Sequence, residues 1–414
     1  MLEGGKYILG ALGLPRKIEG GEPRYETTVY TLMRDGQKKT SKPTGLTMRA
    51  LVEFFPDFSP VFLTTRKAKN QGWMTVIKEF DSPPLSIDIP EGRSEKEIWD
   101  TVVNIVEKLP KDAEIIIDIT YGFRTLPLLA LQSALLAEEM GEVSISGVFY
   151  GAREAAAPGA AETPFFDMTP LLDIQKWSRA LGDLRRFSYT NPLLELLKGT
   201  LEPVFREDQK VFEKPKNLSS LAGHLENVGR ALRTVRVAEA ADASKRLSNV
   251  LPAAERELEY FPELRAVAPF LRPSFEELAS LTPEDYREFS GEEALRAMAQ
   301  MLRYYLRTQA YPEAVTLARE ALVSYCVHKN GGDFFERRDR EAAEDALNQR
   351  GKEHWQKSCS GGKMRNLWQA LSDLRNDINH AGFRRSARRA RKAQEQIENV
   401  CKKVAEYIYN RLIV

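Results

Sequence analysis

The sequence has few cysteines and few histidines. Its three cysteines, Cys326, Cys359 and Cys401, are odd in number and widely spaced, so they match neither a disulfide framework nor a paired-cysteine zinc site. We therefore expect a cytoplasmic protein without a metal centre. Only four histidines occur in 414 residues, so few positions offer a side chain that exchanges protons near neutral pH.

Long hydrophobic runs and an excess of charge are absent as well. The longest apolar stretch, residues 126–137, contains Gln132 and Ser133 and is shorter than a membrane-spanning helix. The N-terminus opens directly into a strand-like run, so we expect neither a signal peptide nor a membrane partner. The formal net charge is +1, so the overall charge predicts no polyanionic partner.

Hydrophobic residues make up 43% of the chain, which is enough for cores in two or three domains. Residues 1–185 alternate strand and helix patterns and predict an α/β domain with a Rossmann-like, mostly parallel sheet. Residues 291–414 predict an all-helical domain. Residues 186–290 predict a helical linker or insertion between the two.

The strongest strand pattern lies at residues 114–120, where continuous β-branched apolar side chains predict a central strand buried on both faces. Residues 11–23 read as a loop rich in glycine and proline. We expect further strands at residues 6–10, 25–33, 60–65, 85–89 and, as the last core strand, 142–150, with helices at 47–55, 68–80, 95–109 and up to about residue 140.

Glycines and polar residues follow several of these strands. In a parallel sheet the carboxyl ends of the strands lie on one edge, where ligands bind. Gly122 permits close approach to the backbone, Arg124 suits a phosphate and Tyr121 suits a base. The alternative is a structural corner in which Asp118 caps a turn and pairs with Arg124. The expected ligand contacts are Gly10, Gly13, Thr64, Thr65, Lys67, Asp118, Thr120, Tyr121, Gly122 and Arg124.

Helical periodicity dominates from about residue 174 onward. Residues 221–251 predict one long amphipathic helix, whereas residues 251–290 contain several prolines and match no motif. Apolar residues at spacings of four and three predict a helix over residues 364–378. A final long helix is expected over residues 386–412.

Arg375 and His380, at the end of the helix predicted over 364–378, form a combination suited to RNA cleavage. The arginine can hold a phosphodiester and offset its developing charge, and the histidine can move protons onto and off the 2′-hydroxyl and the leaving oxygen. Five residues of helix turn through about 140° beyond a full turn, so the pair meets only if the helix ends between them, if the arginine curls round, or if two chains pool their pairs. The alternative is an ordinary helix C-terminus with cations near its negative end.

A basic segment follows this pair. Residues 375–403 contain nine Lys or Arg residues against three acidic ones. Such a local excess suits phosphate contact, and we expect Arg384, Arg385 and Arg388 to bind RNA. A solvated helix surface is the alternative interpretation.

Two motifs carry a resemblance to a known family. Asp118 to Pro127, DITYGFRTLP, resembles the ligand-binding signature of CARF domains. Arg375 to His380, RNDINH, resembles the arginine–histidine signature of HEPN nucleases, including the polar Asn376 directly after the arginine. An α/β domain followed by an all-helical one is also the order found in the CARF–HEPN ribonucleases that accompany type III CRISPR systems.

The resemblance implies a homodimer, or a higher oligomer, that needs no cofactor and is activated by a cyclic oligoadenylate, more readily the tetra-adenylate than the hexa-adenylate. It implies that Arg375, His380 and Asn376 form a composite site of two chains, which cuts single-stranded RNA without a metal and leaves a 2′,3′-cyclic phosphate. Tyr121 departs from the family pattern, which has a smaller residue or a histidine there. Two other functions stay open: a sensor that binds the ring without cutting RNA, and a ring nuclease that degrades the messenger.

Overall fold

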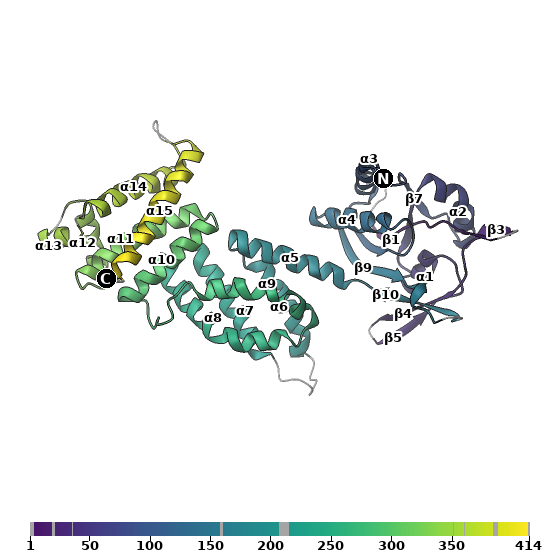
Figure 1. Ribbon diagram of the computed structural model, residues 1–414, viewed down its shortest axis with the longest axis horizontal. Coiled ribbons are helices and arrows are strands. Elements are labelled where there is room, and N and C mark those ends of the chain that lie inside the picture. Colours follow the sequence, from purple (N-terminus) through teal and green to yellow (C-terminus); the bar gives the residue numbers. More distant parts are fainter. Residues whose placement is uncertain are drawn as a thin grey trace. The chain divides into compact units, whose positions relative to one another are not determined.

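The chain folds into two compact units, residues 1–173 and 174–414 (Figure 1). The first unit combines a sheet with helices, and every described element that lies within the second unit is a helix, which confirms the predicted fold class. The expected boundaries at residues 185 and 290 stay predictions. The computed structural model describes residues 4–18, 21–34, 36–157, 160–206, 215–350, 352–359, 361–383 and 388–412.

One eight-stranded sheet forms the centre of the first unit, in the order β5-β4-β10-β9-β8-β1-β6-β7. Neighbouring strands from β9 to β7 are all parallel, whereas β10 is antiparallel to β9 and β5 is antiparallel to β4. The mostly parallel sheet is therefore as predicted. The strands are β1 Lys6–Ala11, β4 Val29–Arg34, β5 Gln37–Thr40, β6 Ser59–Thr64, β7 Leu85–Asp88, β8 Ala113–Asp118, β9 Val143–Gly151 and β10 Glu162–Asp167.

Helices cover both faces of this sheet, and Figure 1 shows α3 and α4 together on one of them. Side chains of the central strand β8 alternate between two cores: Ile115 and Ile117 are buried with residues of α3 and α4, whereas Ile116 is buried with residues of α1 and α2. The continuous apolar run of β8 thus reflects burial on both sides. The helices are α1 Thr47–Phe54, α2 Arg66–Glu79, α3 Glu95–Lys108 and α4 Thr125–Glu139.

Four strands of the first unit were not expected from the sequence. The loop predicted over residues 11–23 contains a hairpin of β2, Arg16–Ile18, and β3, Gly21–Arg24. The strand predicted over 25–33 begins at Val29 and is followed by β5, and β10 makes residues 142–150 an inner strand instead of the last one. All four side chains of β5 are exposed, so no apolar alternation marked it.

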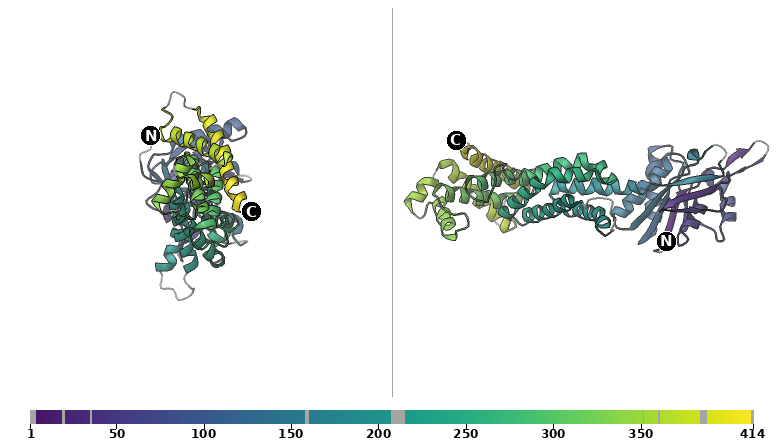
Figure 2. Two further views of the ribbon diagram at one scale, coloured as in Figure 1. Left: turned by 90° about the vertical axis from the view of Figure 1, so that its left-hand side faces the viewer. Right: turned by 90° about the horizontal axis from the view of Figure 1, so that it is seen from below.

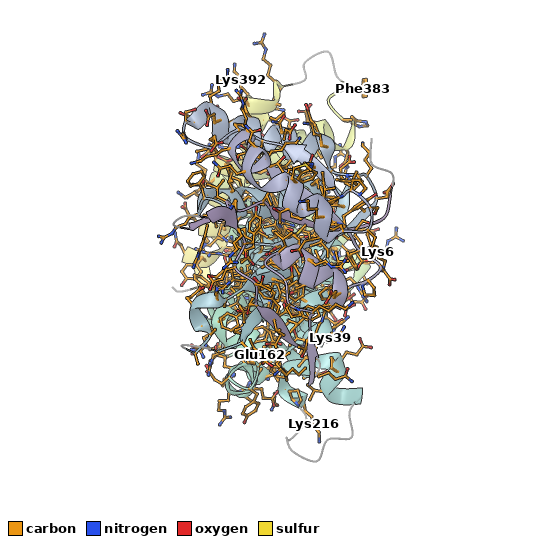
Figure 3. All side chains as sticks on the ribbon, turned by 90° about the vertical axis from the view of Figure 1, so that its right-hand side faces the viewer. Lys6, Lys39, Glu162, Lys216, Phe383 and Lys392 are labelled. Carbon is orange, nitrogen blue, oxygen red and sulfur yellow. The ribbon has the colours of Figure 1, made fainter. Side chains whose placement is uncertain are left out.

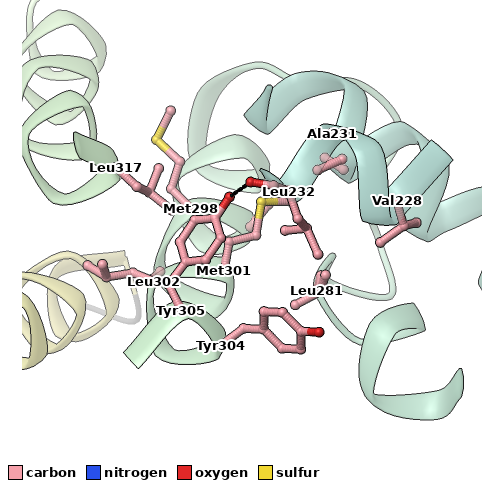
Figure 4. Close-up of a cluster of buried hydrophobic side chains, with 14 of the residues drawn as sticks. Val228, Ala231, Leu232, Leu281, Met298, Met301, Leu302, Tyr304, Tyr305 and Leu317 are labelled. Carbon is pink, nitrogen blue, oxygen red and sulfur yellow. Dashed lines mark hydrogen bonds between the residues drawn. The ribbon is translucent and has the colours of Figure 1, made fainter. Parts of the chain in front are cut away.

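The second unit is a helical array with one extended core. The Tyr305 hydroxyl of α10 donates a hydrogen bond to the Leu232 carbonyl of α7 at 2.6 Å, inside a cluster of apolar side chains (Figure 4). The helix α15, yellow in Figure 2, packs against α10 and α11. The helices are α5 Pro170–Phe187, which begins in the first unit, α6 Asn191–Arg206, α7 Lys216–Arg233, α8 Val237–Leu258, α9 Pro262–Ala279, α10 Gly291–Arg307, α11 Tyr311–Lys329, α12 Arg337–Leu347, α13 Glu353–Cys359, α14 Gly362–Asn379 and α15 Ala390–Leu412.

The single helix predicted over residues 221–251 is wrong, because two helices occupy this stretch. The first, α7, ends at Arg233, and Val235 adopts a left-handed backbone conformation with φ 54° before α8 begins. The turn contains neither glycine nor proline, so the sequence has no residue there that indicates the end of one helix and the start of the next. The final helix begins at Ala390, four residues after its expected start.

Candidate functional site

The carboxyl ends of β1, β6, β7 and β8 meet at one edge of the sheet, as a parallel arrangement requires. A hollow of about 260 Å³ lies at this edge. It is slightly smaller than the pockets that usually enclose a drug-sized molecule. Its walls are Leu12, Gly13, Leu14, Thr65, Ala68, Glu91, Thr120, Tyr121, Gly122, Phe123 and Leu126.

Asp118 lies beneath this edge and holds it together. It is 1% exposed, and its carboxylate accepts hydrogen bonds from the Thr47 hydroxyl at 2.5 Å and from the Thr120 amide at 2.9 Å. Burial raises the pKa of Asp118, while the hydrogen bonds from Thr120 and Thr47 act in the opposite direction. Asp118 therefore caps the turn after β8, and it does not line the hollow.

Tyr121 forms a wall of the hollow and is fixed at both ends. Its hydroxyl donates to the Gly45 carbonyl at 3.0 Å and lies 3.4 Å from the Tyr30 hydroxyl. Its ring packs on Gly13, where an added Cβ would lie 2.9 Å from Tyr121 Cδ1. Burial raises the pKa of Tyr121. The residue that departs from the CARF pattern thus has a structural function in closing the edge of the sheet.

The threonines after β6 are also engaged. The Thr64 hydroxyl donates to Asp88 Oδ1 at 2.8 Å, and Lys69 Nζ bonds the same oxygen at 2.6 Å. The Thr65 hydroxyl caps α2 by accepting from the Ala68 amide at 3.2 Å. Thr65 lines the hollow, and Thr64 does not.

Some of the remaining predicted ligand residues line the hollow and others do not. Gly13, Thr120 and Gly122 line the hollow, and Gly122 has φ 108°, a conformation that favours glycine. Gly10 is buried and does not line the hollow, and an added Cβ there would lie 2.7 Å from Met48 Sδ. Arg124 is exposed at the start of α4, and no bond joins it to Asp118 among the described residues. Lys67 lies in the first turn of α2, outside the hollow.

Six residues of the hollow were not predicted from the sequence, and Glu91 and Phe123 are the charged and the aromatic one among them; the other four are Leu12, Leu14, Ala68 and Leu126. Glu91 follows β7 by three residues, and one of its carboxylate oxygens accepts from the Lys67 amide at 3.3 Å. Phe123 is 49% exposed. The rule that parallel strands end at one edge applies to β7 as well, so it could have identified Glu91.

The second candidate site is the C-terminal end of α14. Arg375 and His380 are both exposed, and Asn376 is half-buried. The helix ends at Asn379, between Arg375 and His380, and the His380 amide still donates to the Asn376 carbonyl at 3.1 Å. His380 thus continues the helical path, which sends the Arg375 and His380 side chains away from the axis about 140° apart. No hydrogen bond joins these two side chains among the described residues.

A Schellman motif closes this helix end. The Gly382 amide donates to the Asp377 carbonyl at 3.0 Å, and the Ala381 amide donates to the Ile378 carbonyl at 2.9 Å. Ala381 and Gly382 are both left-handed, with φ 49° and 74°. The motif fixes the backbone on both sides of His380 while its imidazole stays exposed.

Two further residues of this helix end were not predicted. Asp377 is 8% exposed, and its Oδ1 has no hydrogen-bond partner among the described residues. It lies three residues after the buried Leu374, so the helical stripe could have identified it as an inward carboxylate. Phe383, labelled in Figure 3, is 90% exposed, and no sequence signal marked it.

The predicted basic segment is only partly visible. Arg384 and Arg385 lie outside the described residues. Arg388 is half-buried and Arg389 is exposed just before α15, while Arg391 forms an ion pair with Glu395 at 3.0 Å. No cluster of three His, Cys, Asp or Glu side chains suitable for a metal ion occurs in the described part of the chain. None of the described helices has the length and apolar character of a membrane span.

The fold and the two sites define a protein with a hollow at the edge of an α/β sheet in one unit and an exposed arginine–histidine pair in an all-helical unit. No protein-family model matches the sequence. Over 182 residues the chain is 25% identical to a CRISPR-associated protein of Methanocaldococcus jannaschii. The match covers 42% of this chain and 26% of that protein, so it spans about a quarter of the relative's length.

Among solved structures, Csm6 of Enterococcus italicus bound to cyclic hexa-2′-fluoro-hexa-dAMP aligns with 98% of this chain and 95% of its own, at 11% identity and a TM-score of 0.41. The sequence similarity to the archaeal protein confirms the expected resemblance to CRISPR-associated proteins.

Proposed function

We propose that this protein is a metal-independent endonuclease for single-stranded RNA that a cyclic oligoadenylate activates as part of CRISPR antiviral defence. The observation that carries the proposal is the exposed pair of Arg375 and His380, set on a capped helix end. A guanidinium and an imidazole on a rigid, open surface are the groups that 2′-hydroxyl attack requires. The similarity to a CRISPR-associated protein supports the biological setting.

In the proposed reaction, His380 accepts the proton of the RNA 2′-hydroxyl as its oxygen attacks the adjacent phosphorus. The bond from phosphorus to the 5′-oxygen breaks, and that oxygen takes a proton from a second imidazole or from water. The products are a 2′,3′-cyclic phosphate and a 5′-hydroxyl end. Arg375 stabilises the negative charge on the pentavalent phosphorane, and Asn376 donates a further hydrogen bond to it.

The divergence of the two side chains argues for a composite site. Within one chain, Arg375 and His380 leave the helix about 140° apart, so a phosphate contacted by one lies away from the other. A two-fold axis near the end of α14 would place the arginine of one chain beside the histidine of the other. We therefore propose a homodimer in which two copies of this helix end form one cleavage site, with Arg388 contacting the RNA backbone.

The hollow of the first unit is the proposed activator site. It holds backbone and hydroxyl groups, an exposed Gly122 and a positive charge nearby at Arg124. At about 260 Å³ it is too small for a ring of several nucleotides, so we propose that two copies share one ring. The smaller tetra-adenylate is the expected activator.

The test is cleavage of an unstructured RNA by the purified full-length protein in EDTA, with cyclic tetra-adenylate, with cyclic hexa-adenylate and with neither. Wild type is compared with His380→Ala, and His354→Ala serves as a matched control because His354 is another exposed histidine of the same unit. Ring-dependent cutting that only His380→Ala abolishes supports the proposal. Tight ring binding without RNA cleavage contradicts it and favours a sensor, whereas loss of the ring itself favours a ring nuclease.

A further inference from the structure

Phe383 is the most exposed large hydrophobic side chain in the described part of the chain, at 90%. A phenylalanine in contact with water forgoes the stabilisation that burial of its ring would give. Single exposed apolar residues are common, so exposure alone indicates little. The position of this one, three residues after His380, makes it informative.

The backbone that carries Phe383 is fixed. The Phe383 amide donates to the His380 carbonyl at 2.8 Å, and the two preceding residues are held in left-handed conformations by the Schellman motif. The ring therefore emerges from a closed turn. A ring carried on an ordered backbone loses less conformational freedom when a ligand stacks on it than a ring on an unstructured segment, which favours binding.

Polar and basic residues flank this turn in the sequence. Arg375 and Asn379 on α14 and His380 directly after it are exposed, and Arg389, six residues after Phe383 in the sequence, is exposed as well. Arg388 is half-buried, and Arg391 is paired with Glu395. Aromatic rings beside basic side chains are the usual means by which proteins bind single-stranded nucleic acids, since every base has a face that can stack.

We propose that Phe383 is a stacking platform for an unpaired base next to the scissile phosphate. The inference rests on the proposed function, because it assigns the substrate class of the same site. A base in a duplex has both faces covered by its neighbours, so it cannot stack on this ring without leaving the helix. Phe383 thereby restricts cleavage to unpaired RNA and acts mainly on substrate binding instead of on the chemical step.

The experiment compares wild type with Phe383→Ala, Phe383→Leu and Phe383→Trp. KM and kcat are measured with an unpaired RNA and with the same RNA in a duplex, in the presence of ring. Kd is measured for both RNAs on a His380→Ala background, which keeps the RNA intact. We expect Phe383→Ala to raise KM and Kd for unpaired RNA about tenfold, with a smaller change in kcat. Phe383→Trp should keep wild-type values, and Phe383→Leu should resemble the alanine variant because it lacks a ring face.

Three outcomes overturn the platform. The first is equal KM and Kd for all four proteins while wild type cuts, which leaves the proposed nuclease function standing. The second is a change of oligomer mass by light scattering in Phe383→Ala, which would make the ring a contact between subunits. The third is an equal loss of duplex binding. If wild type cuts nothing, the nuclease proposal fails, and the Kd values for unpaired RNA still decide whether Phe383 stacks.

Discussion

The two candidate sites are built in opposite ways. At the sheet edge, predicted ligand residues such as Asp118, Tyr121 and Thr64 form hydrogen bonds to distant parts of their own unit, and the hollow lies beside them. At the end of α14, Arg375 and His380 have no side-chain partner among the described residues and face solvent. The first site is organised within one chain, whereas the second offers groups that need a second chain or a substrate to bring them together.

This difference separates two kinds of sequence motif. The residues of a motif at a strand end also hold the local fold together, so we expect mutations there to lower stability more than they affect ligand chemistry. An exposed pair of side chains at a helix end contributes little to stability, so we expect mutations of Arg375 or His380 to lower RNA cleavage without lowering the free energy of unfolding. The two kinds of site can therefore be separated by measuring stability and activity on the same variants.

The largest effect is expected for His380→Ala. Loss of a general acid–base group typically lowers the rate about 10²- to 10⁴-fold, and we expect a decrease of about 10³ in kcat for ring-activated RNA cleavage. Because His380 is exposed, the unfolding temperature should stay within about 1 °C of wild type, by the usual tolerance of surface sites. A variant that unfolds early would place His380 in the fold instead of in the chemistry.

Mixed dimers test whether the helix-end site is composite. Arg375→Ala and His380→Ala chains carrying different tags are co-expressed, and the mixed dimers are isolated. If the arginine of one chain works with the histidine of the other, each mixed dimer keeps one intact pair and should cut at least about tenfold faster than either parent. Mixed dimers as inactive as their parents would show that the pair acts within a chain.

Asp118→Ala should affect the other site through stability. The substitution leaves the Thr47 hydroxyl and the Thr120 amide without an acceptor in a buried region, at a cost of about 2–4 kcal/mol in the free energy of unfolding. Arg124→Ala, at an exposed position of the same motif, should change it by less than about 0.5 kcal/mol. Urea unfolding followed by tryptophan fluorescence and circular dichroism measures both. Equal effects would mean that Asp118 does not hold the edge.

The titration of Asp118 gives that comparison a pH dependence. Burial raises its folded pKa above the unfolded value of about 3.9, so folding favours the neutral acid. The resulting stabilisation is fully present below about pH 4 and is lost as the pH rises through the folded pKa. Asp118→Asn cannot titrate, so the stability of wild type relative to this variant should decrease as the pH rises above about 4. A flat or rising difference would contradict the raised pKa.

Sequence patterns predicted the sheet edge because strand ends are indicated by residues that are close together in the sequence. The apolar run of β8 and the glycines after β1 identify strand ends, and parallel strands must end together. The engagement of Tyr121 was not predictable in this way, because its hydroxyl bonds Gly45, 76 residues earlier in the chain. A contact of that kind depends on tertiary packing and leaves no periodic signal.

In the helical unit, too, features that depend on tertiary packing, such as turns between helices, were not predictable from the sequence. The apolar spacing predicted α14 to within a few residues, and the end of the helix before His380 was one of the expected options. The turn between α7 and α8 was missed because Val235 adopts a left-handed conformation that its residue type disfavours. Packing of the two helices stabilises that turn against its local preference.

The smallest effect concerns the cap that positions His380. Ala381 has φ 49°, a left-handed conformation that costs a residue with a Cβ about 1 kcal/mol relative to glycine, and helices most often have glycine at this position. Ala381→Gly should therefore raise the free energy of unfolding by about 0.5–1 kcal/mol, less the extra chain entropy of glycine in the unfolded state. The imidazole of His380 should stay in place, so kcat should not change. Calorimetry of the full-length protein measures the first effect, and ring-activated cleavage measures the second.

Gly382→Ala is the matched opposite change. Gly382 has φ 74°, and no atom of the described residues lies within 4 Å of a Cβ added there, so a loss of stability would report the backbone conformation and not a clash. If Ala381→Gly lowered kcat while it stabilised the fold, the strained cap would be part of the catalytic geometry, and the helix end would be less independent of its surroundings than its exposure indicates.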